Sequence, residues 1–573
     1  MRHCHRRTGG AGISLVKLLA DPEQQLPAIT FWLMGSLAGA KQADVLAALP
    51  AARATLEDTL AVMPGVSSVS HGGGSRNERQ VHVRGFGRWH VPLSIDGIRV
   101  FLPADNRLDY GRFLTPDLSE IQVQKGHVPV VTGPGGMGGA INLVTRKPTQ
   151  PFEGEARIGL EAGNRGDVTG KSGYPSLGTK QELWYAQLTY MYRETGGFYL
   201  SRDFTPVPQQ GSGLRDNTDT EDSRLNLKLG YTPNATDEYV LSYTRQTGAK
   251  SAPYNILLPI RGIPGTGTAG TQRDWTWPEW DISSLAFYSR TEMDRGTLKT
   301  RLYYNTFDNT LSAWDDSTHS SQTVGRAFDS IYDDYSVGAS VSYGTAVGAH
   351  DLTAALHFRR DIHRAASYDK ARVIEADRTA SSPGEPRVST DAVNWQLAAI
   401  WTPGAGGTYH ASASSRTSFP TLFHRYSTGF GRYVPNPDLK AERALNLEQG
   451  YSGDLGPVTF EGALFHSRVS DLIQSVSVGF DPNGDELAQR QNLARATYKG
   501  VELAARWQLN DRLGLMANYI HLDTSVSDPV INGARVTDIP KNKAFLRLDW
   551  QATDRLTVAP SLELYGSRGP TWI

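Results

Sequence analysis

Most of the chain, from residue 152 onward, consists of runs of about ten residues in which apolar and polar positions alternate. The run LNLKLGY at 225–231 and the run VELAARWQL at 501–509 show the pattern most clearly. Period-two alternation is typical of a β-strand whose two faces meet different surroundings. The apolar face meets lipid in a membrane barrel, whereas it forms the core of a soluble sandwich. In a barrel, the outward set would be Leu225, Leu227, Leu229, Val501, Leu503 and Trp507, and the inward set Lys228, Glu502 and Arg506.

The connections between these runs alternate in length, which separates the two alternatives. Short connections lie at 232–237, 293–296, 345–350, 403–407, 453–456, 509–512 and 552–555. Long polar connections lie between them, near 198–222, 248–279, 309–330, 365–390, 417–443, 470–497 and 524–540. Tight turns at one end and long loops at the other are the layout of an outer-membrane barrel, and neither a sandwich nor a propeller requires it. We therefore predict an all-β, transmembrane antiparallel β-barrel with about 16 or 17 strands between residues 152 and 566.

Residues 55–150 follow a different pattern, with short β-branched runs, glycine-rich turns and one helical segment. Thr55 can cap a helix over residues 55–63, and Pro64-Gly65 ends it. Short strands are predicted at 81–86, 92–97, 120–126 and 140–146. We expect this segment to form a separate α+β domain inside the lumen of the barrel.

Composition narrows the range of functions. The 573 residues carry a net charge of −1, which gives no electrostatic basis for binding nucleic acid. The single cysteine, Cys4, leaves no cysteine pair for a disulfide or a metal cluster. No run approaches about 18 consecutive apolar residues, so no membrane-spanning helix is predicted. The pattern Gly133-x-Gly135-x-x-Gly138 matches a dinucleotide fingerprint, but a strand rather than a helix follows it. We predict no enzyme, no cofactor and no metal site.

The N-terminal segment 1–40 is interpreted as an export leader. A basic start is followed by the apolar stretch 26–40, which ends in Ala38-Gly39-Ala40, the pattern of a cleavage site. Asp21 and Glu23 lie in an unusually long leader, and a misassigned start codon is the alternative interpretation.

Five motifs occur in order in the first domain: TLEDTLAVMPGVSS, VRGFG, LSIDGIRV, IQVQKG and GGMGGAINLVTRKP. Together they resemble the plug domain of TonB-dependent receptors, and the segments 436–451, 492–503 and 538–550 resemble barrel strands of the same family. The resemblance implies a plug domain at 41–150 and, at 151–573, a barrel of the type with about 22 strands. The residues that match the plug motifs are Arg84, Gly85, Asp96, Gly97, Gly126, Gly138, Gly139 and Asn142.

Both ends depart from the family pattern. We find neither a TonB-contacting segment nor a first plug strand between Lys41 and Thr55, and the chain stops at Trp572-Ile573 just after a predicted strand. We therefore expect an incomplete, unclosed barrel, in which the first strand, near 153–162, does not pair with the last, near 555–566.

The resemblance also implies a function. A TonB-dependent receptor is a gated importer of the bacterial outer membrane, and here we expect a monomer whose partners are membrane lipid, a metal chelate and the TonB complex. A ferric siderophore is the leading ligand, because it is the commonest in the family. Cobalamin and haem are alternatives, and haem is considered because His424 lies near the place where haem receptors carry an axial histidine. A passive porin and an adhesive surface barrel are alternatives of a different class.

Aromatic and arginine side chains suit an anionic chelate, because they supply stacking and positive charge. The candidate contacts are Arg88, Trp89, Phe101, Arg107 and Tyr110 at the plug tips, and Tyr254, Trp275, Trp277, Trp280 and His424 in the barrel loops. The three tryptophans equally fit an aromatic girdle at the membrane interface. We expect the loops at 248–279 and 417–443 to lie at the same end of the barrel as the plug tips.

Overall fold

A computed structural model describes most of the chain outside the N-terminal segment. The described residues are 43–47, 55–60, 63–70, 76–126, 128, 133, 135–162, 167–207, 210–253, 274–325, 327–348, 350–369, 374–375, 378–379, 392–403, 407–428, 432–482, 486–527, 539–553 and 556–567. The predicted leader, the candidate contact Tyr254 and the last six residues lie outside them. Within them, no helix is long and apolar enough to cross a membrane.

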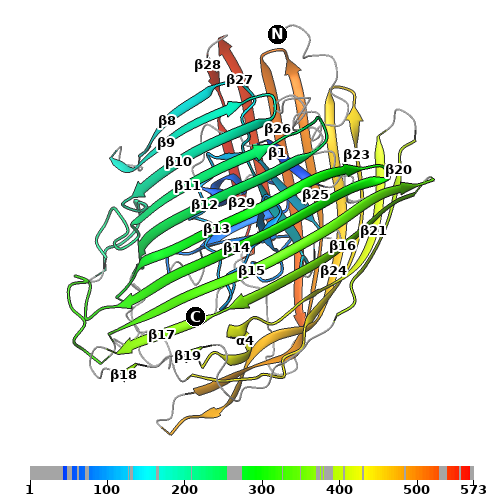
Figure 1. Ribbon diagram of the computed structural model, residues 1–573. Helices are drawn as coiled ribbons and strands as arrows, with labels where there is room; N and C mark the ends of the chain where they lie inside the picture. The colour runs from blue at the N-terminus through cyan, green and yellow to red at the C-terminus, as the bar shows by residue number, and fades with distance from the viewer. Residues whose placement is uncertain are drawn as a thin grey trace.

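Long antiparallel strands form the wall that dominates Figure 1. The first group comprises β8 (Glu153–Ala162), β9 (Val168–Lys180), β10 (Trp184–Thr195), β11 (Thr220–Tyr231), β12 (Glu238–Ser251), β13 (Trp275–Met293), β14 (Gly296–Ala313), β15 (Phe328–Val347), β16 (His350–Ile362), β17 (Arg364–Asp369), β18 (Ile374–Glu375) and β19 (Arg378–Thr379). The second comprises β20 (Trp395–Trp401), β21 (Thr408–Ser418), β22 (Tyr433–Val434), β23 (Glu442–Leu455), β24 (Val458–Phe480), β25 (Glu486–Asn510), β26 (Leu513–Ser527), β27 (Asn542–Thr553), β28 (Leu556–Val558) and β29 (Ser561–Tyr565). A short helix, α4 (Leu422–Tyr426), lies in the loop after β21.

The ladders of the wall are interrupted at two places within the described residues. β8 pairs with β9, and among the described residues no ladder joins it to β28 or β29. That the barrel is incomplete stays a prediction. A second break, which the sequence did not predict, separates β16 from β20. β16 and β17 both pair with β15, and β28 and β29 both pair with β27. Each of these two pairs therefore occupies a single strand position in the wall. With each pair counted once and the two-residue strands β18, β19 and β22 left out, the described wall has 17 strands, which agrees with the 16 or 17 expected from the sequence.

The N-terminal domain lies inside this wall, where Figure 1 shows it in blue behind the green strands. It contains α3 (Leu56–Leu60) and the strands β1 (Ala43–Ala47), β2 (Val66–Ser70), β3 (Arg79–Val83), β4 (Leu93–Ile95), β5 (Ile98–Val100), β6 (Leu118–Lys125) and β7 (Gly139–Thr145). Five of the strands form a sheet in the order β1-β6-β7-β4-β5, and β2 pairs with β3. Among the described residues, no ladder joins this domain to the wall, so the predicted separate lumenal domain is confirmed.

One expectation about this domain is wrong. The sequence showed no first plug strand between Lys41 and Thr55, but β1 lies there and pairs with β6 from Ala43↔Gln124 to Ala47↔Glu120. The run ADVLA is short and rich in alanine, a residue that is depleted in strands, so its identity depends on pairing with β6.

The two faces of the wall strands have the predicted orientation. Leu227 and Leu229 are 37% and 47% exposed, whereas Lys228 between them is 1% exposed and contacts the inner domain. On β25, Trp507 is 42% exposed and Glu502 is 4% exposed. Leu225, Val501 and Leu503 share the outward face with these residues, and Arg506 shares the inward face. Apolar residues therefore face outward and polar residues face the lumen, as in a barrel surrounded by lipid.

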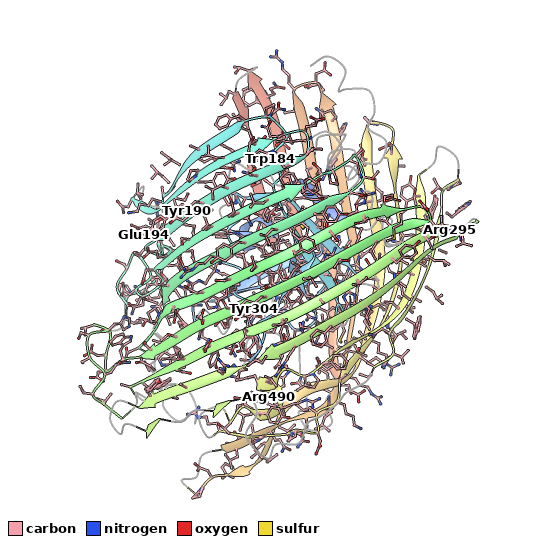
Figure 2. All side chains as sticks on the ribbon, viewed as in Figure 1. Trp184, Tyr190, Glu194, Arg295, Tyr304 and Arg490 are labelled. Carbon is pink, nitrogen blue, oxygen red and sulfur yellow. The ribbon has the colours of Figure 1, made fainter. Side chains whose placement is uncertain are left out.

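Aromatic side chains gather on the outer face at the short-turn end of the strands. Trp401, Tyr409, Tyr451 and Phe460 form a continuous row, with ring centroids 5.4, 4.9 and 6.4 Å apart. Trp184, Tyr231, Trp507 and Trp550 lie beside other short turns. Figure 2 shows Trp184 and Arg295 at this end, with Glu194 and Arg490 toward the other. An aromatic belt of this kind marks one membrane–water interface.

We predict that arginine in place of Leu227 lowers the free energy of unfolding by roughly 2–4 kcal/mol, because the guanidinium would enter hydrocarbon. Glu221→Arg is the matched control, since Glu221 lies on the same face at the loop end of β11, where the expected change is about 0–1 kcal/mol. Chemical unfolding in lipid vesicles measures both changes. Equal values for the two variants would contradict a lipid-facing surface at Leu227.

Candidate functional site

A buried cluster of charged groups joins the inner domain to the wall. The guanidinium of Arg84 donates from Nε and Nη2 to the two carboxylate oxygens of Glu502, each at 3.0 Å, and from Nη1 to Glu448. Lys125 Nζ lies 3.1 Å from the same Glu502 carboxylate. Burial lowers the pKa of Arg84, but the two carboxylates outweigh it and raise the pKa above its ordinary value. These buried ion pairs fix the position of the inner domain, because separating the partners leaves charges buried and uncompensated.

Further polar contacts of the same kind surround the inner domain. They join Asp96 to Lys228 at 3.2 Å, Asp109 to Lys250 at 2.8 Å, Arg112 to Asp222 at 2.9 Å, Asp117 to Arg224 at 2.9 Å and His90 to Glu442 at 2.8 Å. Each of these pairs has one member on the inner domain and one on a wall strand. Much of the interface between the two parts is therefore ionic. The apolar residues of the inner domain, among them Leu56 and Leu143, also share one core cluster with wall residues such as Phe465 and Tyr498.

The glycines of the predicted plug motifs occupy tight turns. Asp96 and Gly97, with φ of 50° and 77°, form the two-residue turn between β4 and β5, a conformation that asparagine, aspartate and glycine favour. Asn142 Oδ1 accepts a hydrogen bond from Gly97 N at 2.8 Å. A Cβ on Gly139 would stand 2.3 Å from the carbonyl oxygen of Gln124, so the close approach of β7 to β6 requires glycine. Gly85 and Gly126 also have positive φ, and Gly138 lies against Phe86.

The tips of the inner domain meet the α4 loop at the long-loop end of the barrel. Phe423 N donates to Ala104 O at 2.8 Å, and the ring of Trp89 lies 5.2 Å from that of His424. The loop after β12 begins at the same end of the barrel. Ser251, the last residue of β12, accepts a hydrogen bond at its carbonyl oxygen from Asn77 Nδ2 of the inner domain at 3.2 Å. The prediction that both loops lie with the plug tips is thus confirmed for their described residues.

Cationic and aromatic side chains alternate across this mouth. The guanidiniums of Arg107 and Arg490 lie 5.8 and 4.4 Å from the ring of Phe423, and Arg490 lies 4.2 Å from the ring of Tyr433. Arg107 Nε donates to Asp105 at 2.9 Å, which fixes its direction. Trp89, Arg107, Phe423 and Tyr433 are half-buried, and Arg490 is 9% exposed. We call Trp89, Arg107, Phe423, Tyr433 and Arg490 the mouth cluster.

Two candidate contacts lie beneath this surface. Arg88 is 1% exposed and Tyr110 is 0% exposed, so neither reaches a ligand at the mouth in this structure. Arg88 Nη1 lies 3.6 Å from Glu78, which also receives Arg76 Nε at 2.9 Å. Burial raises the pKa of Glu78, but Arg76, Arg107, Lys250 and Arg88 together lower it well below its ordinary value. Arg88 and Tyr110 therefore support the tips from below.

The tryptophans at the start of β13 do not form the membrane girdle that was the alternative interpretation of them. Trp277 and Trp280 are 3% and 4% exposed and face the inner domain. The guanidinium of Arg76 lies 4.9 Å from the Trp277 ring, and Phe113 lies 5.8 Å from Trp280. Trp275 is half-buried and packs edge-on against Phe328 at 6.3 Å. The girdle is formed by other aromatics, at the opposite end of the strands.

The surroundings of His424 fit a structural role better than a haem ligand. Its Nδ1 accepts the backbone N–H of Thr421 at 3.4 Å, and its own N–H donates to Thr421 Oγ1 at 3.2 Å, which completes the N-cap of α4. With Nδ1 as acceptor, a neutral ring carries its proton on Nε2 and has no free lone pair there for iron. Among the described residues, no group of three or more His, Cys, Asp or Glu could hold a metal ion.

The sequence missed Phe423, Tyr433 and Arg490 as parts of the mouth. Phe423 and Tyr433 lie in the long loop 417–443, which had been assigned to the mouth, so its aromatic residues were the available signal. Arg490 lies on β25, and no local pattern brings it to Phe423, because that contact depends on the length of β24 and β25 beyond the other strands.

We predict that Glu502→Ala destabilises the seating of the inner domain by roughly 3–5 kcal/mol, because Arg84 and Lys125 lose their shared carboxylate. Amide hydrogen exchange of β6 in the purified protein measures this effect as faster exchange. Arg506→Ala on the same face of β25 is the control and should leave β6 unchanged. Equal protection of β6 in both variants would contradict the role of the cluster.

We also predict that His424 remains neutral through the mildly acidic range. Burial lowers its pKa from 6.5 to about 4, although Glu442 opposes the shift. Because the folded state disfavours the charged ring, stability from this group is complete above 6.5 and is lost as pH falls toward 4. Carbon-13 NMR of labelled histidine should give a midpoint near 4 for the signal that His424→Gln removes. A midpoint near 6.5 would show that the ring is solvated.

Comparison with known proteins agrees with this geometry. A family model for the TonB-dependent receptor plug domain matches residues 42–140, and one for the TonB-dependent receptor-like β-barrel matches residues 160–572. The vitamin B12 transporter BtuB of Photobacterium profundum is 22% identical over 464 residues, which are 79% of this chain and 70% of that protein. An iron-regulated outer membrane virulence protein of Vibrio cholerae is 23% identical over 535 residues, covering 89% and 78%.

Solved structures share the fold. The copper transporter OprC superposes with a TM-score of 0.71 at 15% identity, covering 91% of this chain and 86% of that one. The siderophore receptor PirA of Acinetobacter baumannii gives 0.64 at 14% identity, covering 96% and 88%. The ferric enterobactin receptor PfeA of Pseudomonas aeruginosa gives 0.63 at 14% identity, covering 92% and 86%. The two family models span most of the sequence, and this chain belongs to the TonB-dependent receptors, plugged β-barrels of the bacterial outer membrane that transport ligands rather than catalyse reactions.

Proposed function

We propose that this receptor imports an anionic, aromatic iron chelate, a ferric siderophore of the catecholate type. The observation that carries the proposal is the mouth cluster, in which Arg107 and Arg490 flank Phe423. Guanidinium groups attract the negative charge of a ferric catecholate, and the rings offer faces on which catechols stack. Arg107 belongs to the plug and Arg490 to the barrel, so a ligand placed between them contacts both parts at once.

The relatives support an iron chelate without naming it. One of them is an iron-regulated outer membrane protein, and two similar structures are siderophore receptors. Cobalamin is the second candidate, because the vitamin B12 transporter is similar to this chain over a comparable share of its length. Copper is less well supported, since a soft-metal site needs thiolate or thioether ligands. Among the described methionines, Met63, Met137 and Met191 are buried, and Met293 and Met516 lie near short turns, away from the mouth.

Transport in this proposal needs movement of the plug. The ion pairs between plug and wall argue against the passive porin, because a domain fixed by several buried pairs stays in the lumen until work is done on it. The family relation supplies the source of that work, the TonB complex on the periplasmic side. The chain's own residues bind the ligand and hold the plug, and no covalent step is involved.

We predict that cells producing this protein as their only receptor accumulate ⁵⁵Fe presented as a tricatecholate complex, and that loss of TonB abolishes the accumulation. ⁵⁷Co-labelled cobalamin, measured in the same cells, tests the second candidate. Iron uptake that persists without TonB would favour a porin. Cobalamin uptake without iron uptake would replace the proposed ligand.

We further predict that Arg107→Ala and Arg490→Ala each weaken surface binding of the ferric tricatecholate about tenfold, which corresponds to about 1.4 kcal/mol. Arg245→Ala is the control, because the Arg245 side chain is 55% exposed on the outer face of β12. Binding is measured on energy-depleted cells with equal amounts of receptor in the membrane. Unchanged affinity in both mouth variants would reject the mouth cluster as the binding surface.

A further inference from the structure

The outer face of β23, β24 and β25 changes from apolar to basic along the strands. These three strands lie side by side in the wall. Toward the short turns, their outward residues include Leu447, Leu464 and Leu503, which are 47%, 50% and 39% exposed. Closer to the long loops, basic side chains take outward positions. We call them the basic patch, which consists of Arg443 on β23, Arg468 on β24, and Arg495 and Lys499 on β25.

The register of the strands brings these cations together. Arg468 stands opposite Leu445 of β23 and Thr497 of β25. The other members of the patch lie two residues along β23 or β25 from these partners and on the same face, so they are diagonal neighbours of Arg468. Cα atoms of diagonal neighbours are about 7–8 Å apart, within reach of long side chains. The cations therefore stand close enough together to contact one ligand.

The patch carries positive charge that the wall does not neutralise. In the part of the chain that the structure describes, no ion pair or side-chain hydrogen bond engages Arg468 or Arg495, and Asp471, which follows on β24, pairs with neither. The third arginine of the patch donates to uncharged oxygen atoms, a backbone carbonyl and a serine hydroxyl. Lys499 lies 3.2 Å from Asp523, but both side chains are exposed, and such a pair is weak.

The patch lies where the hydrocarbon of the membrane ends on the side of the long loops. Trp507 of β25 belongs to the aromatic belt at the opposite interface. At about 3.3 Å per residue and a tilt of roughly 40°, β25 rises about 25 Å between Trp507 and Thr497, the residue opposite Arg468. The apolar band of an outer-membrane barrel is about 25 Å tall. The cations therefore stand at the level of the lipid headgroups, beside leucines that contact the acyl chains.

Farther round the wall, the loop end of the strands carries the opposite charge. Asp281, Asp308 and Asp333 stand opposite one another on β13, β14 and β15, on the outward face, and we call them the acidic row. Arg245 lies 3.6 Å from Asp281, and Arg364 lies 3.5 Å from Asp333. Exposed arginines there have carboxylate partners, so the unpaired charge of the basic patch is a local feature and not a general property of this rim.

We propose that the basic patch binds the phosphate groups of a phosphorylated glycolipid in the outer leaflet of the membrane. A phosphate monoester carries about −1.5 to −2 charges at neutral pH, and its oxygen atoms match the planar donor groups of arginine. The acyl chains of the same lipid would cover Leu445 and Leu464, which are 41% and 50% exposed beside the patch. Free phosphate shares the charge but lacks these chains. The inference does not depend on which ligand the receptor transports.

The test measures binding of diphosphoryl lipid A to the purified full-length receptor in neutral detergent by native mass spectrometry. Arg468→Gln and Arg495→Gln should each weaken binding about fivefold, and the double variant about 25-fold, since each cation near an anionic lipid contributes about this factor. Arg245→Gln is the matched control, because Arg245 is an outward arginine of β12 that already has a carboxylate partner. It should bind the lipid as the unchanged protein does.

Further arms separate this lipid from other sources of negative charge. The double variant Arg468→Lys, Arg495→Lys keeps both charges and should retain binding within about twofold, which separates loss of charge from failure to fold. Dephosphorylated lipid A should bind as weakly as the diphosphoryl lipid binds to the double glutamine variant. Inorganic phosphate at the same concentration should not displace the lipid, because it makes no contact with the leucines.

The proposal is overturned if the unchanged protein does not bind diphosphoryl lipid A, if the double glutamine variant binds it equally well, or if inorganic phosphate displaces it. It is also overturned if sedimentation shows self-association that the double glutamine variant loses while lipid binding stays the same. The patch would then contact the acidic row of a second copy. Surface binding of the ferric tricatecholate should be normal in the double glutamine variant, so this inference and the proposed function fail independently.

Discussion

The ionic contact between the plug and the inner face of the wall is the interaction on which the rest of the structure depends. Alternating strands that place apolar residues toward lipid must place polar ones toward the lumen, so Lys228, Glu502 and their neighbours point inward. Once the lumen is filled, those groups are cut off from water and need partners of opposite charge. Arg84 and Asp96 supply such partners from the plug. The pattern of the barrel therefore determines the surface of the plug.

The same contact explains how a plug can be both firmly seated and removable. When the plug shifts, water can replace each separated ionic partner, whereas exposing an apolar interface costs about 25 cal/mol per Å² with no such replacement. The apolar residues of the plug, including Leu56 and Leu143, belong to a core cluster that extends to wall residues such as Phe465 and Tyr498, so a shift of the plug also has to separate some apolar contacts. The ion pairs resist movement while they are dry and lose most of their strength when water enters. A pulling force then has to separate only the first pairs before the others become weak.

Periodicity made the wall predictable from the sequence, and bulges limited the prediction. Leu227 and Lys228 lie on opposite faces because their strand keeps an uninterrupted register with its neighbours. Trp277 and Trp280 are three positions apart, yet both face the plug, because the ladders shift register between Thr276 and Glu279. A bulge changes which face a side chain occupies and leaves no reliable mark in a single sequence. Arg88 was assigned to the surface for a related reason, since the burial of a loop residue depends on partners such as Glu78 that are distant from any repeating pattern.

The hairpin of β4 and β5, with the plug segment that follows it, extends from the lumen to the mouth. One continuous segment carries Arg99 and Phe101 in the lumen and Arg107 in the mouth cluster, and its turn at Asp96 is held to the wall by Lys228. A displacement of Arg107 at the mouth therefore acts on a segment whose other end is fixed by a buried ion pair. The mouth and the Asp96–Lys228 pair are thus linked through the chain itself.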